Sequence, residues 1–144
     1  MSIAGDAAVT RDSGATLMET LVVVALTAMA ATILFPRVER GYAAVSLHEG
    51  TAVLMADLRT AHATAIRTAA RVTFSVGDDG RTYAWTPGFA KVTPSGVNIT
   101  PAGAAIAFFP DGSTTGGALM LSSGASRVVV AVDPSTAAVS AGSP

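Results

Sequence analysis

The chain has 144 residues, enough for one domain, and half of them are hydrophobic while only 13% are charged. Its net charge of −1 provides no bulk electrostatic attraction for nucleic acid. Because the chain contains no cysteine, disulfides, thiol nucleophiles and cysteine-based zinc sites are excluded.

Residues 1–13 are small and polar, which is typical of a disordered leader. An ordinary secretory signal would have a basic start, a short apolar core and a small-x-small cleavage site after that core. Here the leader has one basic residue, Arg11, and the small residues around position 29 lie inside the apolar run that follows. The pattern therefore disfavours an ordinary secretory signal.

An apolar run occupies residues 17–35, and Glu19 is its only charged residue. As a helix it would rise about 28 Å, roughly the hydrocarbon thickness of a bilayer, so it is predicted to span a membrane. A carboxylate costs about 2.5–3.5 kcal/mol at the membrane centre and less near an interface. Two interpretations of Glu19 stay open: it lies at the headgroup boundary of a simple anchor, or it has a functional partner.

A second helical stretch is predicted from residue 37 to residue 70, ending near Arg71, and Pro36 is predicted to end or kink the helix before it. Its apolar residues recur at spacings of seven, four, three and four, which places them on one face. We expect this face to pack on a sheet of the same domain, and we expect the charged residues of the stretch to lie largely elsewhere. The apolar positions are Leu47, Leu54, Leu58, Ala61 and Ala65, and the charged ones are Arg40, Glu49, Asp57, Arg59 and Arg67.

Strands are predicted throughout the rest of the chain, beginning with a hairpin whose turn is formed by residues 77–80. The fold class is therefore α+β, with a long N-terminal helix packed on a C-terminal antiparallel sheet. The apolar segment 128–132 is predicted to be a central strand of that sheet. The expected strands are residues 71–76, 81–85, 97–100, 105–109, 119–121, 127–132 and 137–140.

The sequence favours no catalytic, cofactor or metal site. His48 and His62 would be about 21 Å apart on one helix, too far for a shared metal, so both are interpreted as surface or interface residues. Asp78 and Asp79 flank the hairpin tip, where a solvated turn is favoured and a calcium ion stays an open alternative. Beyond residue 81 the only basic residues are Lys91 and Arg127, so no nucleic-acid partner is expected.

The spacing of Gly14, Ala15, Thr16, Leu17 and Glu19 before the apolar run resembles the processing signal of type IV prepilins and type II secretion pseudopilins. The resemblance implies that a prepilin peptidase cuts between Gly14 and Ala15 and methylates the new amino terminus. It also implies that Thr16, Leu17 and Glu19 govern processing and docking, with Glu19 pairing with the terminal amine of a neighbouring subunit. The chain has Ala15 where the family usually has phenylalanine.

The C-terminal half resembles the protein H branch of minor pseudopilins, the GspH/FimT-like family. The resemblance rests on the turn at residues 109–113, on Gly117 and on the strand that begins at Arg127. The final strand lacks the glycine that is usual there, and the segment 85–100 is not covered. Membership would imply a pilin-like fold and a minor pseudopilin near the tip of a periplasmic pseudopilus, held in the inner membrane before assembly with other pseudopilins.

The expected organisation is a removed leader at residues 1–14, a membrane and assembly helix at 15–35, an amphipathic helix at 36–70 and a periplasmic β-domain at 71–144. Two alternatives remain open. One is a minor pilin of a type IV pilus, acting in adhesion or DNA uptake. The other is a membrane-anchored periplasmic binding module or enzyme that never polymerises.

Overall fold

The computed structural model describes residues 12–142 and contains one helix followed by eight strands in that range. The described residues divide into two compact units, the first ending at Glu39 and the second beginning at Arg40. The helix α1 (Asp12–Thr68) begins in the first unit and ends in the second. Its backbone is helical at position 36, so the helix does not end at Pro36, and a kink there stays a prediction.

The helix ends at Thr68, three residues before the predicted end near Arg71. Ala69 adopts a left-handed backbone conformation, with φ of 50°. The N–H of Ala69 donates to the carbonyl of Ile66 at 3.4 Å, and that of Ala70 donates to the carbonyl of Ala65 at 3.3 Å. This pair of bonds is a Schellman cap, in which glycine usually occupies the left-handed position. The cap stops the helix and turns the chain into the first strand.

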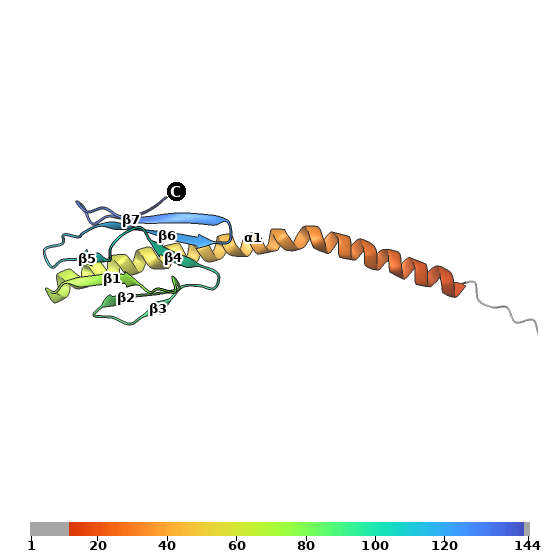
Figure 1. The fold of residues 1–144 in the computed structure, drawn as a ribbon, viewed down its shortest axis with the longest axis horizontal. Coiled ribbons are helices and arrows are strands. Elements are labelled where there is room, and N and C mark those ends of the chain that lie inside the picture. Colours follow the sequence, from red (N-terminus) through yellow and green to blue (C-terminus); the bar gives the residue numbers. More distant parts are fainter. Residues whose placement is uncertain (1–11, 143–144) are drawn as a thin grey trace, which may run out of the picture. The chain divides into compact units, whose positions relative to one another are not determined.

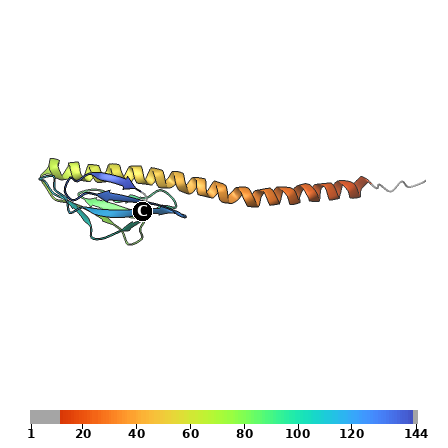
Figure 2. The same cartoon turned by 90° about the horizontal axis from the view of Figure 1, so that it is seen from above.

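The part of α1 in the second unit buries one face, as the apolar spacing predicts. Its five predicted face residues are all less than 5% exposed: Leu47, Leu54, Leu58, Ala61 and Ala65. Both sheets lie on the same side of this part of the helix (Figure 2). The predicted packing of the helix on antiparallel strands is therefore confirmed.

The first sheet contains four antiparallel strands in the order β3-β2-β1-β5. β1 and β2 form the predicted hairpin around residues 77–80, and β5 pairs with the other edge of β1. β3 pairs with β2 and was not predicted, since two residues are too few to give an alternating pattern. The strands are β1 (Val72–Val76), β2 (Thr82–Thr86), β3 (Lys91–Val92) and β5 (Ile106–Phe108).

The second sheet is also antiparallel and has the order β4-β6-β7-β8. β7 lies between β6 and β8, so the prediction that residues 128–132 form a central strand is confirmed. The strand pattern predicts a single sheet, and the structure instead forms two. Strand patterns locate strands but do not identify their partners, and here β4 pairs with β6 instead of joining β5. The strands are β4 (Asn98–Pro101), β6 (Gly117–Ser123), β7 (Ser126–Val132) and β8 (Val139–Gly142).

One core joins the helix to both sheets. Figure 1 shows the strands of both sheets along the C-terminal part of α1. The helix contributes Leu54 and Leu58, the first sheet contributes Phe74 and Phe108, and the second contributes Leu121 among others. All five are 1% exposed or less. Burying a large apolar side chain stabilises the folded state by about 1.5–3 kcal/mol, so this shared core holds the two sheets on one helix.

Candidate functional site

The first unit presents an apolar helical surface on every side. Leu21, Val22, Val23 and Val24 are consecutive, and each is more than half exposed. Successive residues of a helix point about 100° apart, so four in a row cover nearly the whole circumference. A helix that is apolar all round needs lipid or other helices around it, because water solvates such a surface poorly.

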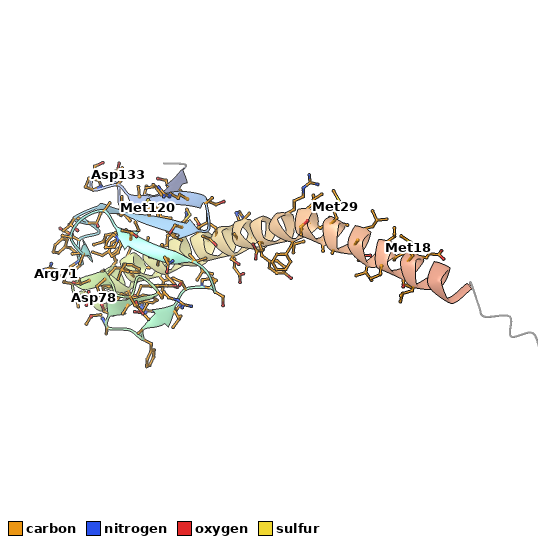
Figure 3. All side chains as sticks on the ribbon, turned by 45° about the vertical axis from the view of Figure 1, so that its right-hand side comes forward. Met18, Met29, Arg71, Asp78, Met120 and Asp133 are labelled. Atoms are coloured by element: carbon orange, nitrogen blue, oxygen red, sulfur yellow. The ribbon has the colours of Figure 1, made fainter. Side chains whose placement is uncertain are left out.

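Within residues 12–142, α1 is the one helix that is long and apolar enough to cross a membrane. An 18-residue apolar stretch of it has a mean hydropathy of 2.1. Side chains such as Met18 and Met29 project from it, at 71% and 66% exposure (Figure 3). None of this 18-residue stretch is buried by the rest of the chain. The segment therefore leaves its apolar area available to a membrane or to partner helices.

The threonines of the apolar segment are satisfied within the helix. The hydroxyl of Thr20 donates to the carbonyl of Leu17 at 2.8 Å, and the hydroxyls of Thr27 and Thr32 donate to carbonyls three or four residues earlier. Such bonds let a hydroxyl sit in an apolar environment without another partner. Glu19 is the remaining polar side chain of residues 17–35 and is exposed. If this segment is buried in an assembly, the Glu19 carboxylate therefore needs a partner from another chain.

The predicted processing residues lie at the start of this surface. Gly14, Ala15 and Thr16 belong to the helical backbone of α1, while their side chains lie outside those that the structure describes. Leu17 is 65% exposed and follows them directly. Their predicted roles in cleavage and docking stay predictions, as does the role of Glu19.

A buried polar cluster in the second unit was missed from the sequence. Asp57 was expected among the outward-facing charges, but it is only 7% exposed, so that expectation is wrong. The Tyr83 hydroxyl donates to the Asp57 carboxylate at 2.7 Å, and the Lys91 ammonium donates to its other oxygen at 2.7 Å. Burial, together with the hydrogen bond and charge of Asp57, raises the pKa of Tyr83 above its usual value.

This cluster ties the helix to the first sheet, because Asp57 lies in α1 while Tyr83 and Lys91 lie in β2 and β3. A buried carboxylate is tolerated when a cation and hydrogen bonds compensate for its lost hydration. Lys91 also lies over the Trp85 ring, 5.2 Å from its centroid. A sequence signal existed: Asp57 precedes Leu58 and lies three residues after Leu54, at the flank of the buried face.

The two histidines take different positions in the second unit. His48 is exposed, whereas His62 is half-buried, with its Nε2 3.0 Å from the Gly112 carbonyl oxygen and its ring 5.5 Å from that of Phe108. His62 therefore links α1 to the turn that carried part of the family resemblance. Within residues 12–142, no three histidine or acidic side chains come close enough to hold a metal ion.

That turn, residues 109–113, is closed by local hydrogen bonds. Gly112 N–H donates to the Phe109 carbonyl at 3.0 Å, and Phe109 N–H donates to the Ser113 carbonyl at 2.9 Å. Gly112 has φ of 85°, a conformation that favours glycine. The Asp111 carboxylate accepts bonds from the backbone and hydroxyl of Ser113, which lower the pKa of Asp111. The motif therefore has a structural role at the end of β5.

At the hairpin tip, the Asp79 carboxylate accepts hydrogen bonds from within the same turn. One Asp79 oxygen accepts hydrogen bonds from the backbone N–H groups of Arg81 and Thr82 and from the Thr82 hydroxyl. These bonds lower the pKa of Asp79 below its usual value. Asp78 lies beside it at the edge of the molecule (Figure 3). The turn role that the sequence favoured thus accounts for the contacts of Asp79.

The family model for the type II transport protein GspH matches residues 51–136, which include the end of α1 and most of both sheets. The chain belongs to the GspH family. The match begins well after Glu19, so the GspH family model does not cover the processing signal. A search of curated protein sequences finds no match.

Solved structures share the GspH fold at low sequence identity. The minor pseudopilin EpsH from the type II secretion system of Vibrio cholerae is 9% identical, covers 69% of this chain and 98% of its own, and superimposes with a TM-score of 0.58. The type IV minor pilin FimU of Pseudomonas aeruginosa is 11% identical in each of two crystal forms. These cover 65% and 67% of this chain and 86% and 92% of their own, with TM-scores of 0.56 and 0.53.

Membership in the GspH family fits a structural subunit of a type II transport system, and the fold is shared with the minor pseudopilin EpsH. The apolar helix and GspH membership fit a membrane-anchored subunit of a periplasmic pseudopilus. The type IV minor pilin FimU shares this fold as well.

Proposed function

We propose that this chain is a minor pseudopilin that enters a type II secretion pseudopilus by transferring its apolar helix from the membrane to a bundle of similar helices. The observation that carries the proposal is the complete exposure of residues 17–35 on a chain whose second unit is a GspH domain. Both environments, lipid and helix bundle, cover the same apolar area. The transfer is therefore compatible with one unchanged sequence.

Processing prepares the helix for this transfer. In our proposal a prepilin peptidase removes residues 1–14 by cutting between Gly14 and Ala15, with Thr16 and Leu17 in the recognised segment, and methylates the new terminus. The new terminus lies four residues before Glu19, within about 6 Å along a helix. The amine of a neighbouring subunit supplies the cation that makes burial of this carboxylate tolerable.

The proposed organisation follows the same boundaries. Residues 15–35 form the inner-membrane and assembly helix, residues 36–70 the part of the helix that carries the sheets, and residues 71–144 the periplasmic β-domain. Assembly is with major and minor pseudopilins, at a place near the fibre tip. The net charge of −1 supports a role that does not involve nucleic acid.

The intact mass of the mature protein tests this proposal. We expect the full chain, purified from membranes of a host with its own type II system, to begin at Ala15 with one added methyl group. A Gly14→Val variant should keep residues 1–14, whereas Gly5→Val, in the same leader, should be processed normally. A native chain that still begins at Met1 would contradict the proposal.

A second measurement separates secretion from a pilus. Deleting the gene should reduce release of secreted proteins and leave pilus-dependent motility and DNA uptake unchanged. The opposite pattern would assign the chain to a type IV pilus, whose minor pilin FimU shares the fold.

A further inference from the structure

The part of α1 in the second unit carries two exposed arginines, Arg59 and Arg67. A helix brings an ion-pair partner alongside a residue when it lies three or four positions away, and neither arginine has an acid at those positions. From residue 58 to residue 77 the chain contains three arginines and no acid. Among the side chains that the structure describes, the one ion pair joins Lys91 to Asp57. The two arginines are therefore cations that the described part of the chain does not neutralise.

The nearest acids of the β-domain in sequence are engaged in their own turns. Asp79 accepts hydrogen bonds from Arg81 N–H and from Thr82, and Asp111 accepts them from Ser113. Asp133 likewise accepts bonds from groups two and three residues later. None of these carboxylates forms an ion pair with Arg59 or Arg67 in the described residues. A carboxylate for these arginines would therefore come from another molecule.

A depression of about 300 Å³ lies between the two arginines. Its lining between them consists of small, uncharged side chains, those of Thr60, Ala63 and Thr64. Ala63 lies two residues from both Ala61 and Ala65, which are buried, and two residues correspond to about 200° around a helix. Both sheets lie on the other side of this part of α1 (Figure 2). A partner can therefore reach the depression without displacing a strand.

The two guanidinium groups suit a pair of carboxylates at a defined separation. Arg59 Nη2 donates to the carbonyl of Val139 in β8 at 3.3 Å, which anchors this side chain and leaves its other donors available. Arg67 lies eight residues later, about 12 Å further along the helix axis. A guanidinium group binds a carboxylate through two parallel hydrogen bonds. On an extended segment, acids four residues apart lie on one face and are separated by about 13 Å, close to the spacing of the two arginines.

We propose that Arg59 and Arg67 bind an acidic segment of a neighbouring pseudopilin of another type, whose two carboxylates pair with the two guanidinium groups across the depression. Charge complementarity decides the occupant, because both cations are unpaired within the described residues and the lining between them lets a partner backbone approach closely. A nucleic acid fits less well, since it needs a longer row of cations and the net charge of the chain is −1. The contact rests on the proposed function and deepens it by naming the chemistry of the partner.

The contact should govern which partner binds and in which register. Exposed ion pairs contribute little to affinity, whereas complementary charges across an interface fix its register and exclude partners of the wrong charge. The apolar helices are therefore expected to hold the subunits together, and Arg59 and Arg67 to select the neighbour. For this reason the test uses the full chain, in membranes of a host with its own type II system.

A zero-length carbodiimide tests the contact directly, because it joins an amine to a carboxylate that touches it. Arg67→Lys keeps the positive charge and introduces a reactive amine, and the native chain has a single lysine, Lys91. We expect Arg67→Lys to become joined to an Asp or Glu of another pseudopilin, identified by mass spectrometry of the linked peptides. The matched control is Arg127→Lys, at an exposed arginine of β7, which should give severalfold less of this product.

Charge reversal supplies a second measurement on the same surface. Arg67→Glu should reduce the amount of other pseudopilins that copurify with the chain, whereas Arg67→Lys should preserve it. Arg81→Glu, at an exposed arginine of the first sheet's hairpin, is the control and should leave copurification unchanged. Thermal unfolding of the same preparations checks that each variant is folded, since a change at an exposed position should alter stability little.

Four results would overturn the proposal. They are equal crosslinking of Arg67→Lys and Arg127→Lys, crosslinks of Arg67→Lys to its own chain only, no crosslink at all, and undiminished copurification of Arg67→Glu. Weaker retention of Arg67→Glu on phosphatidylglycerol vesicles or on DNA, with copurification unchanged, would also overturn it in favour of a lipid or nucleic-acid surface.

The mature N-terminus, measured on the same samples, separates this contact from the proposed function. A chain that begins at Ala15 and supports secretion, but whose Arg67→Lys variant does not crosslink to another pseudopilin, overturns the contact and leaves the proposed function intact. A native chain that begins at Met1 contradicts the proposed function itself.

Discussion

The hydroxyl of Tyr83 donates a 2.7 Å hydrogen bond to the carboxylate of Asp57, joining the second strand of the first sheet to the helix at a site closed to solvent. Lys91 holds the other oxygen of the same carboxylate. Loss of either partner would leave the carboxylate partly uncompensated. The cluster therefore stabilises one specific placement of the first sheet on the helix.

Removing the hydroxyl should measurably destabilise the second unit. Hydrogen bonds to charged groups are worth about 1.5–3 kcal/mol, so Tyr83→Phe should lower the free energy of unfolding by about that amount. Urea denaturation of the full chain in detergent, followed by Trp fluorescence, would measure it. The control is Tyr42→Phe, since Tyr42 is 74% exposed and its loss should change stability by less than about 0.5 kcal/mol. Equal effects of the two variants would contradict this account.

A glycine at the helix end should stabilise the protein. Ala69 has φ of 50° in the Schellman cap, where a Cβ is unfavourable. We expect Ala69→Gly to raise the free energy of unfolding by about 0.5–1 kcal/mol. Ala63→Gly, in the exposed helix interior, should lower it by about 1 kcal/mol, because glycine is a poor helix former. A loss of stability in Ala69→Gly would show that the cap contributes no strain.

Gly117 should tolerate no side chain. It has φ of 152°, and an added Cβ would lie 2.9 Å from a side-chain carbon of Ile106. Gly117→Ala should therefore cost about 1–3 kcal/mol through strain and overpacking at the start of β6. Gly103→Ala is the matched control, because nothing lies within 4 Å of its added Cβ, and it should be close to neutral. Thermal unfolding of both variants would settle the comparison.

Acid should weaken the turn that precedes β8. The hydroxyl of Ser135 and the N–H groups of Ser135 and Thr136 donate to Asp133, and these bonds lower its pKa to about 2. Because the folded-state pKa lies below the unfolded value of about 3.9, the contribution of Asp133 is complete above that value. It is lost as the pH falls from about 4 to about 2. Asp133→Asn should flatten the fall in the urea midpoint over this range, and an unchanged slope would contradict the prediction.

Glu19 should be needed for assembly and not for processing. Glu19→Ala removes the proposed partner of the neighbouring amine, so we expect a chain that starts at Ala15 but does not copurify with other pseudopilins. Glu39→Ala, an exposed acid of the same helix, should assemble normally. The readouts are intact mass and crosslinking of the assembled fibre. A Glu19→Ala chain that joins the fibre as well as the native chain would refute the charge-pairing account.

The helix and its buried face could be predicted because their pattern is local. Leu54, Leu58 and Ala65 fall on one helical face, and spacing alone reveals it. The burial of Asp57 was not predicted although the residue flanks the buried face, since this burial depends on Tyr83 and Lys91, which lie 26 and 34 residues away. Charged residues are also normally exposed, so the sequence alone predicts an exposed side chain for Asp57.

The strands were predicted better than their pairing. Alternation located β1, β2 and β7. No local pattern shows that β4 pairs with β6, because β5 lies between them in the sequence and belongs to the other sheet. The two-residue strand β3 and the neighbouring Phe89 gave no periodic signal.

The buried face of the helix has a practical consequence for producing a soluble fragment. The first core side chain of α1 is Leu47, whereas the last residue of the apolar run is residue 35. A recombinant fragment that begins between positions 40 and 46 would lack the apolar run and keep every core side chain of α1, from Leu47 onward. A version starting beyond Leu58 would expose the interiors of both sheets and precipitate.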